Sequence, residues 1–210
     1  MALLRKKIKK GLPVPRARSG RIFVISGPSG SGKTTLVNAL LADGDLRGKL
    51  VRSISFTTRP RRTCEKNKRD YFFITKNEFI RMRSGKKILE WTRYLGYYYG
   101  TPRDTTEAYL AQGRSIALCL DFKGALRLKK LYPAAAVTVF VRPSSVKDLS
   151  RRIEGRCRNT DKEEIKKRVE LAEKEMLQAD KYDYCVVNKK LDVAVEKLKK
   201  VIMKEIGKTV

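Results

Sequence analysis

GPSGSGKT, residues 27–34, is the stretch that decides the fold, because it fits the phosphate-binding pattern G-x-x-x-x-G-K-[S/T]. Residues 21–26 (RIFVIS) form an apolar run typical of a buried parallel strand, and residues 34–41 continue as an amphipathic helix. The loop therefore leads into a helix N-terminus, where backbone N–H groups and the helix dipole attract anions. An ordinary glycine-rich turn is the alternative, but the flanking strand and helix favour a phosphate-binding loop.

Two side chains of this loop carry specific chemistry. Lys33 can reach the outer phosphates of a nucleotide, and the Thr34 hydroxyl is placed to bind Mg²⁺. The glycines let the backbone wrap closely around a phosphate. We therefore expect the chain to bind a nucleoside triphosphate together with Mg²⁺.

The composition is typical of a soluble globular protein, with 210 residues of which 41% are hydrophobic. No apolar run reaches the ~18 residues that a membrane span requires, so we expect no membrane association. The four cysteines form no C-x-x-C pair and histidine is absent. This argues against a Cys/His zinc site and excludes a His-based catalytic triad. Scattered cysteines, interpreted as reduced thiols, favour a cytoplasmic protein.

The net charge is +27, from 49 basic and 22 acidic residues. Such an excess predicts nonspecific attraction to polyanions through a basic surface. A generally basic proteome or a high-salt cytoplasm is an alternative origin of the charge. The sequence carries no recognised DNA- or RNA-binding signature, so we expect no obligatory nucleic-acid partner.

The N-terminal segment differs from the rest of the chain. The first acidic residue is Asp43, and the segment before residue 21 mixes lysine and arginine with glycine and proline. This composition predicts a disordered basic arm over residues 1–20. An organelle-targeting peptide is the alternative, although the arm is rich in lysine and poor in serine.

From residue 21 onward, apolar strand-like runs alternate with helical patterns. The expected strands are Ile22–Ser26, Ser115–Asp121, Ala136–Arg142 and Tyr184–Asn188. The expected helices begin near Lys33, Arg103, Phe122, Ser145, Lys162 and Leu191. This alternation predicts an α/β fold, a three-layer core whose parallel sheet is covered by helices on both faces. In the last helix a stripe at helical spacing is expected to face the core, comprising Leu191, Val195, Leu198 and Ile202.

The stretch over residues 51–99 follows a different pattern, with short runs rich in Tyr, Phe and Thr around one helix. It predicts a small mixed α/β lobe inserted into the core. Arg59 and Arg62 lie in this stretch beside several hydroxyl groups, and guanidinium forks with hydroxyl donors suit a phosphate monoester. Tyr71 and Tyr99 add phenolic donors. Surface charge for the arginines and plain packing for the tyrosines are the alternatives.

Glu90 interrupts an otherwise apolar strand, ILEW at residues 88–91. A carboxylate facing inward there is costly unless it is paired. A guanine base supplies that pairing, because its N1–H and exocyclic N2–H₂ groups donate side by side to one carboxylate.

With these residues in place, the chain resembles the guanylate kinase family, whose members move a phosphoryl group from ATP to GMP. The resemblance runs from about residue 21 to 206. It implies a kinase domain over residues 21–210, with a GMP-binding lobe at about 52–101 and a helical lid at about 144–168. It also implies ATP and GMP or dGMP as substrates, Mg²⁺ as the metal ion, and a place in purine nucleotide metabolism.

The resemblance further implies roles for individual residues. The GMP-binding positions are Ser55, Arg59, Arg62, Tyr71, Glu90, Tyr99, Thr101 and Asp121. The ATP-binding positions are Gly27, Pro28, Ser29, Gly30, Ser31, Gly32, Lys33, Thr34, Thr35, Arg152 and Asn188. Thr34 would bind Mg²⁺ with the phosphates and waters, and Asn188 would lie near the adenine. The catalytic positions are Lys33, Arg62, Arg156, Arg168 and Asp121.

The chain also departs from the family pattern. The departures are Cys119 and Lys123 (an aspartate and a glutamine in the family), Cys64 and Lys68 (glycines) and Lys189 (an acid). The spacing between Arg156 and Arg168 is one residue longer than usual, which makes Arg158 a second candidate for the lid arginine.

Two other functions compete with this interpretation. A related module that binds a phosphopeptide is the first, but such modules have degraded phosphate loops and this loop is intact. A kinase acting on a ribose bisphosphate is the second, and Glu90 with Ser55 favours a guanine base instead. The sequence leaves the oligomeric state open between a monomer and a homodimer.

Overall fold

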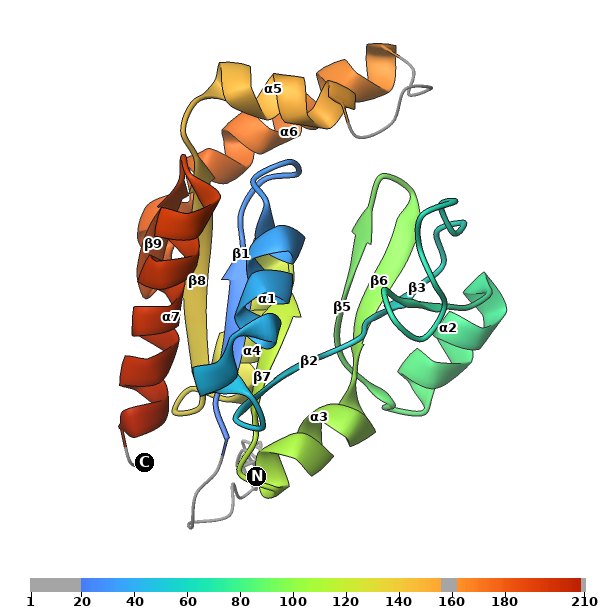
Figure 1. The fold of residues 1–210 in the computed structure, drawn as a ribbon. Coiled ribbons are helices and arrows are strands. Elements are labelled where there is room, and N and C mark those ends of the chain that lie inside the picture. Colours follow the sequence, from blue (N-terminus) through green and yellow to red (C-terminus); the bar gives the residue numbers. More distant parts are fainter. Residues whose placement is uncertain (1–19, 156–161, 209–210) are drawn as a thin grey trace, which may run out of the picture.

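A computed structural model describes residues 20–155 and 162–208, in two sheets flanked by helices (Figure 1). The strands are β1 (Ile22–Ser26), β2 (Leu50–Arg52), β3 (Phe56–Thr57), β4 (Phe72–Phe73), β5 (Ile88–Tyr94), β6 (Tyr97–Pro102), β7 (Ser115–Cys119), β8 (Ala136–Pro143) and β9 (Tyr184–Asn188). The α-helices are α1 (Lys33–Ala42), α2 (Lys76–Ser84), α3 (Arg103–Ala111), α4 (Phe122–Leu131), α5 (Val146–Gly155), α6 (Lys162–Met176) and α7 (Leu191–Gly207). The predicted basic arm over residues 1–20 lies, apart from Gly20, outside the described residues.

The main sheet has five parallel strands in the order β2-β7-β1-β8-β9. The central strand β1 pairs with β7 on one side and β8 on the other, so that Val24 lies between Leu118 and Thr138. Because all five strands are parallel, their carboxyl ends meet at one edge, which is where ligands bind in sheets of this kind. The GPSGSGKT loop follows β1 at that edge.

The two faces of the main sheet are covered by different helices, because successive side chains of a strand point in opposite directions. Phe23 and Ile25 pack into the cluster that includes buried residues of α1 and α7. Ile22 and Val24 pack into the cluster that includes buried residues of α3 and α4. The predicted three-layer α/β core is confirmed.

Most of the predicted elements are present with small shifts at their ends. Strands β1 and β9 occupy the predicted residues, while β7 ends at Cys119 and β8 at Pro143. In the apolar stripe of α7, Leu198 and Ile202 are fully buried. The prediction was wrong for Leu191, which is 44% exposed, because it is the first residue of α7.

The second sheet forms a separate lobe with the mixed strand order β4-β3-β6-β5. Helix α2 begins with a capping box between Thr75 and Glu78, and it contributes the fully buried Phe79 to the lobe. The lobe begins later than its composition indicated: residues 50–52 form β2, which pairs with β7 in the main sheet. Such a short strand gives little local signal.

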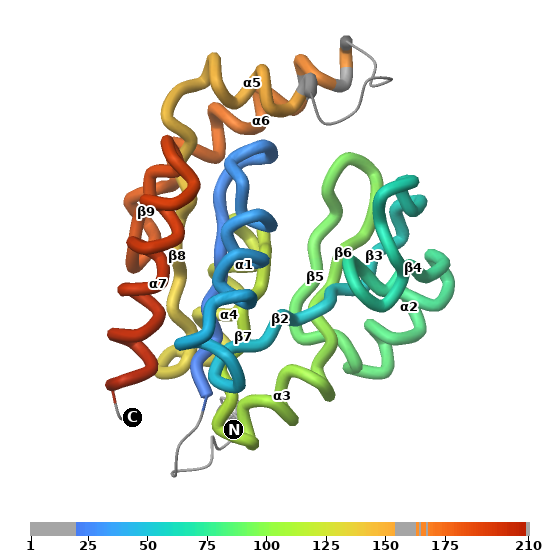
Figure 2. The backbone as a smooth tube through the Cα atoms, in the orientation of Figure 1, coloured from blue at the N-terminus to red at the C-terminus, as the bar shows by residue number. Residues whose placement is uncertain are grey.

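Helices α5 and α6 pack on each other through Leu149, Ile153 and Ala172. A Cβ placed on Gly30 of the phosphate loop would lie 3.0 Å from Ile153 and 3.1 Å from Leu149. Helix α5 therefore rests directly on the loop, and α6, which packs on α5, continues to Met176. Figures 1 and 2 place these helices and the second lobe around the same end of β1.

No helix in the described parts of the chain combines the length and the apolar character needed to cross a membrane.

Candidate active site

The GPSGSGKT loop adopts the backbone conformation that its glycines allow. Gly27, Gly30 and Gly32 have φ angles of 132°, 84° and 93°, in the region that side chains disfavour. Gly27 also lies against β8, since a Cβ there would approach the Val141 carbonyl oxygen to 2.3 Å. The loop ends at Gly32, the N-cap of α1, and no side chain caps this helix. The first turn of α1 thus presents backbone N–H groups to an anion.

The Lys33 ammonium donates hydrogen bonds to the carbonyl oxygens of Gly27 and Pro28, at 2.6 and 2.8 Å. These contacts hold the charge over the loop that would cradle the phosphates. Lys33 and Thr34 both line a cavity of about 740 Å³. Thr35 is exposed and does not line it.

Asn188 supports this loop from the end of β9. Its Nδ2 atom donates a hydrogen bond of 2.8 Å to the Ser31 carbonyl oxygen, and the residue is 4% exposed. A Cβ on Gly32 would come within 2.3 Å of the same nitrogen. Arg152 of α5 in turn donates a 3.3 Å hydrogen bond to the Asn188 carbonyl oxygen. Both residues therefore brace the loop, and neither lines the cavity.

The cavity extends from the phosphate loop into the second lobe. Of the predicted residues it brings together Gly27, Ser29, Gly30, Gly32, Lys33, Thr34, Ser55, Arg59, Arg62, Tyr71, Glu90, Tyr99 and Asp121. The loop glycines and Lys33 lie at one end, and the lobe residues lie at the other. This arrangement suits a nucleoside triphosphate facing a second, smaller anion.

Glu90 is 1% exposed at the junction of the lobe and the main sheet. Its Oε1 atom accepts a 2.6 Å hydrogen bond from the Thr101 hydroxyl, and its Oε2 atom has no partner among the described residues. Burial raises the pKa of Glu90 to about 7, against the effect of the Thr101 hydrogen bond. A buried acceptor of this kind is costly without a donor, and a ligand that donates two N–H groups would pair it.

Asp121 follows β7 and caps α4. Its Oδ1 atom accepts from the Gly124 N–H at 2.8 Å, and its Oδ2 atom accepts from the Thr92 hydroxyl at 2.7 Å. Because Thr92 belongs to β5, this carboxylate ties the lobe to the main sheet. A Cβ on Gly124 would lie 2.9 Å from Glu90 Oε2 and 3.2 Å from Asp121 Oδ1, so both carboxylates converge on this glycine.

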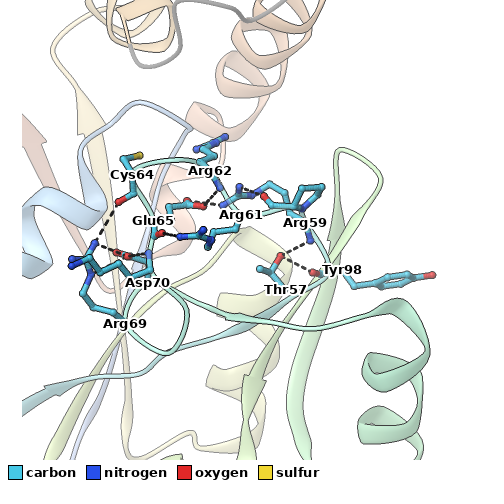
Figure 3. A network of polar contacts seen from close by, with 11 residues as sticks. Thr57, Arg59, Arg61, Arg62, Cys64, Glu65, Arg69, Asp70 and Tyr98 are labelled. Carbon is cyan, nitrogen blue, oxygen red and sulfur yellow. Dashed lines mark hydrogen bonds and ion pairs between the residues drawn. The ribbon is translucent and has the colours of Figure 1, made fainter.

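A loop between β3 and β4 holds the arginines in a dense polar network (Figure 3). Glu65 accepts from the Arg59 guanidinium at 2.7 Å and from the Arg62 N–H at 3.0 Å. Burial would raise the pKa of Glu65, but these hydrogen bonds outweigh it and hold that pKa below its usual value. Glu65 thereby orients Arg59 toward the cavity, a role that the sequence did not indicate.

The tyrosines of the lobe face this network. The rings of Tyr71 and Tyr99 meet edge to face with centroids 6.0 Å apart, and the Arg59 guanidinium lies 5.7 Å from the Tyr71 centroid. Burial raises the pKa of Tyr71 to about 12. The phenol therefore stays protonated at neutral pH and can donate a hydrogen bond to a phosphate.

The lid arginines are only partly described. Arg156 and Arg158 lie outside the described residues. Arg168 is half-buried on α6 and does not line the cavity. Its charge acts on the Tyr94 phenol, whose pKa burial raises to about 12, so α6 approaches β5 of the lobe.

Sequence reasoning missed several residues that line the cavity, notably Glu175 and Arg52. Glu175 stands near the end of α6, where burial raises its pKa to about 7 against the positive charge of Lys33. The fold of α6, far along the chain from the phosphate loop, brings this carboxylate to the site. The departures Cys64 and Cys119 also line the cavity, and both are free thiols.

The residues present fit Mg²⁺ bound mainly through a nucleotide. The described residues contain no group of three or more His, Cys, Asp or Glu side chains able to hold a metal ion. Thr34 lines the cavity at the start of α1 and offers one hydroxyl oxygen. Mg²⁺ ordinarily keeps few protein ligands and completes its shell with phosphates and waters.

Comparisons with known proteins agree with this geometry. The family model described as guanylate kinase matches residues 19–205. The chain belongs to the guanylate kinase family. It is 40% identical over 199 residues to the guanylate kinase of Mycoplasma genitalium, covering 95% of this chain and 82% of that protein. It is also 40% identical over 190 residues to the guanylate kinase of Thermotoga maritima, covering 90% and 89%.

A solved member of the guanylate kinase family has the same fold. The crystal structure of guanylate kinase from Anaplasma phagocytophilum matches with a TM-score of 0.77 and 31% identity, over 91% of this chain and 89% of that one. The chain is therefore a nucleotide-binding kinase with guanylate kinase activity, and the predicted family is confirmed.

Proposed function

We propose that this chain transfers the γ-phosphoryl group of ATP to GMP, and to dGMP, in the cytoplasm. The buried Glu90 carboxylate is the observation that supports GMP as the phosphoryl acceptor. One of its oxygens accepts a hydrogen bond from Thr101, and the other has no partner in the described residues. Guanine presents two adjacent N–H donors to such a carboxylate. Adenine presents no such pair and would leave the charge buried and unpaired.

The acceptor's phosphate would lie against the arginine and tyrosine end of the cavity. Arg59 is oriented by Glu65, and Tyr71 and Tyr99 offer phenolic donors nearby. Guanidinium groups bind phosphate oxygens in pairs, so this end fixes the position of the attacking oxygen. That oxygen is already anionic, which means that the transfer needs no general base and the absence of histidine costs it nothing.

The donor would occupy the phosphate loop. Backbone N–H groups at the start of α1 and the Lys33 ammonium face its outer phosphates, and this positive charge stabilises the negative charge that spreads over the transferred group. Mg²⁺ would supply positive charge that offsets the negative charge of the phosphates. Thr34 would hold it. Helix α5 rests on the loop through Leu149 and Ile153, and the α5–α6 pair would exclude water from the transfer.

The free thiols support the proposed compartment. Cys64, Cys119 and Cys185 are free among the described residues, as expected where thiols are kept reduced.

The test is ADP formation from Mg·ATP with GMP, dGMP, AMP, CMP and UMP in parallel, at moderate salt. We expect turnover with GMP and dGMP alone. Measurable ATP binding with no turnover on any of the five would contradict the proposal and would favour another phosphate acceptor.

A further inference from the structure

Arg52 lies at the carboxyl end of β2, where the main sheet meets the lobe. It pairs in register with Ala117 of β7, and its half-buried side chain lines the same cavity as Lys33 and Arg59. Nothing in its neighbourhood along the chain marks it as a site residue. It reaches the cavity only because it belongs to the three-residue strand β2, which pairs with β7 in the main sheet.

A contact with α1 fixes where the Arg52 guanidinium lies. Its Nη1 atom donates a 3.1 Å hydrogen bond to the Asn38 side-chain oxygen. Asn38 follows Thr34 by four residues, so both side chains lie on the same face of α1, one turn apart. The guanidinium is therefore hydrogen-bonded to a residue one helical turn from Thr34, which lines the cavity at the start of α1.

No carboxylate among the described residues neutralises the charge of Arg52. Within residues 20–155 and 162–208 its hydrogen-bond partner is the neutral Asn38 amide, and it forms no ion pair there. Arg59, by contrast, is paired with Glu65 at 2.7 Å. Of the nearby acids, Asp70 is already bound to Arg69 at 2.8 Å.

The neighbouring Cys119 does not neutralise the guanidinium either. Burial raises the pKa of the Cys119 thiol and outweighs the positive charges of Lys33 and Arg52, which lower it. This thiol therefore stays neutral at physiological pH. Arg52 thus acts electrostatically on Cys119 beside the phosphate loop and on Asp70 beside the arginine loop. Its position is between the two anion sites of the cavity.

We propose that Arg52 is a further phosphate-binding residue of this enzyme, contacting the phosphate chain where the donor's terminal phosphate meets the acceptor's phosphate. This assignment rests on the proposed function. The alternative is a structural role, in which the side chain only ties β2 to α1 through Asn38.

Four variants separate the two roles. Arg52→Gln removes the charge, Arg52→Lys keeps a charge without the planar fork, and Asn38→Ala removes the hydrogen bond but keeps Arg52. Arg81→Gln is the matched control, because it removes one exposed arginine on α2, which does not line the cavity. A purely structural contact predicts equal effects for Arg52→Gln and Asn38→Ala.

The first readout is equilibrium binding, measured by calorimetry in the absence of catalysis. The probes are ATP alone, GMP alone, and a pentaphosphate that joins adenosine to guanosine and spans both sites. We expect Arg52→Gln to weaken pentaphosphate binding by about 10- to 100-fold, the range for a lost hydrogen bond to a charged group. Asn38→Ala should weaken it by less than fivefold, Arg52→Lys should be intermediate, and Arg81→Gln should match the unaltered chain.

The ATP and GMP arms identify which phosphate Arg52 contacts, according to which nucleotide loses affinity. Thermal unfolding of the four variants separates a binding effect from loss of the fold. Pentaphosphate affinity unchanged in Arg52→Gln, or reduced equally in Asn38→Ala, would overturn the assignment. If the assignment of Arg52 fails but the unaltered chain turns over GMP normally, the proposed function stands. If the unaltered chain does not turn over GMP, the proposed function itself is wrong.

Discussion

The Thr101 hydroxyl donates a 2.6 Å hydrogen bond to Glu90 Oε1 and thereby fixes the plane of a carboxylate that is 1% exposed. The other oxygen, Oε2, faces Gly124 so closely that a Cβ there would lie 2.9 Å away. Because Gly124 has no side chain, nothing from this position crowds the oxygen. The pair Thr101–Glu90 is thus a preformed acceptor for two adjacent N–H donors.

Replacing Glu90 by Gln should reduce kcat/KM for GMP by about 10²- to 10⁴-fold, because an amide offers one acceptor and places N–H groups against those of guanine. ATP affinity should change by less than threefold. Steady-state kinetics with each substrate varied in turn gives both values, and Glu170→Gln on the exposed side of α6 is the matched control. Equal GMP efficiency in Glu90→Gln and the unaltered chain would remove Glu90 from base recognition.

The same carboxylate should make stability depend on pH. Burial raises the pKa of Glu90 from 4.5 to about 7, so the folded ligand-free chain binds more protons than the unfolded chain between these values. The stabilising contribution is complete below pH 4.5 and is lost as the pH rises through 7. Relative to the unaltered chain, Glu90→Gln should therefore gain about 2–3 kcal/mol in its free energy of unfolding between pH 5 and pH 8.

Urea denaturation of both proteins at the two pH values measures this change. A difference between the proteins that is the same at pH 5 and pH 8 would show that Glu90 titrates as an ordinary exposed carboxyl group.

Lys68 has a φ angle of 65°, in the left-handed region, at a position where the resemblance to the family implies glycine. A side chain costs ~1–2 kcal/mol there, while glycine loses ~0.5–1 kcal/mol through its greater freedom in the unfolded chain. Lys68→Gly should therefore stabilise the protein by ~0.5–1 kcal/mol, or about 2 °C in Tm. Lys66→Gly, in the same loop but without a left-handed φ, should destabilise it; a lower Tm for Lys68→Gly would refute the strain argument.

Asn188 is expected near the adenine, and its hydrogen bond to the Ser31 carbonyl oxygen shows that it supports the phosphate loop. Asn188→Ala would leave that buried carbonyl unpaired, at a cost of ~1–3 kcal/mol in stability. Affinity for ATP and for inorganic tripolyphosphate should fall by the same factor. A loss confined to ATP would point to an adenine contact. Calorimetric titration of both ligands distinguishes these results.

The parts of the site that the sequence predicts are those with a local signal. The GPSGSGKT loop has a fixed pattern between a strand and a helix, and the continuous apolar run of β1 indicates that both faces of this strand are buried. The isolated acid in an apolar strand likewise predicts that Glu90 is inward-facing, and the structure buries it.

The parts that could not be predicted depend on contacts between distant segments. Strand β2 has three residues, and its place in the main sheet follows from pairing with β7 more than 60 positions away, roughly a third of the chain. Arg52 reaches the cavity only through that pairing. Glu175 of α6 reaches it only through the tertiary fold. The role of Glu65 follows only from its hydrogen bond to Arg59 in the folded loop.

The proposed function is that the chain phosphorylates GMP and selects it through the two adjacent N–H donors of guanine. The most direct measurement is a competition, in which ATP labelled at its γ-phosphate is offered with equimolar GMP, IMP and AMP and the labelled diphosphates are separated. We expect labelled GDP in large excess. Labelled IDP should be reduced because IMP lacks the N2 donor, and labelled ADP should be close to background. Labelled IDP or ADP in amounts equal to GDP would contradict the claim.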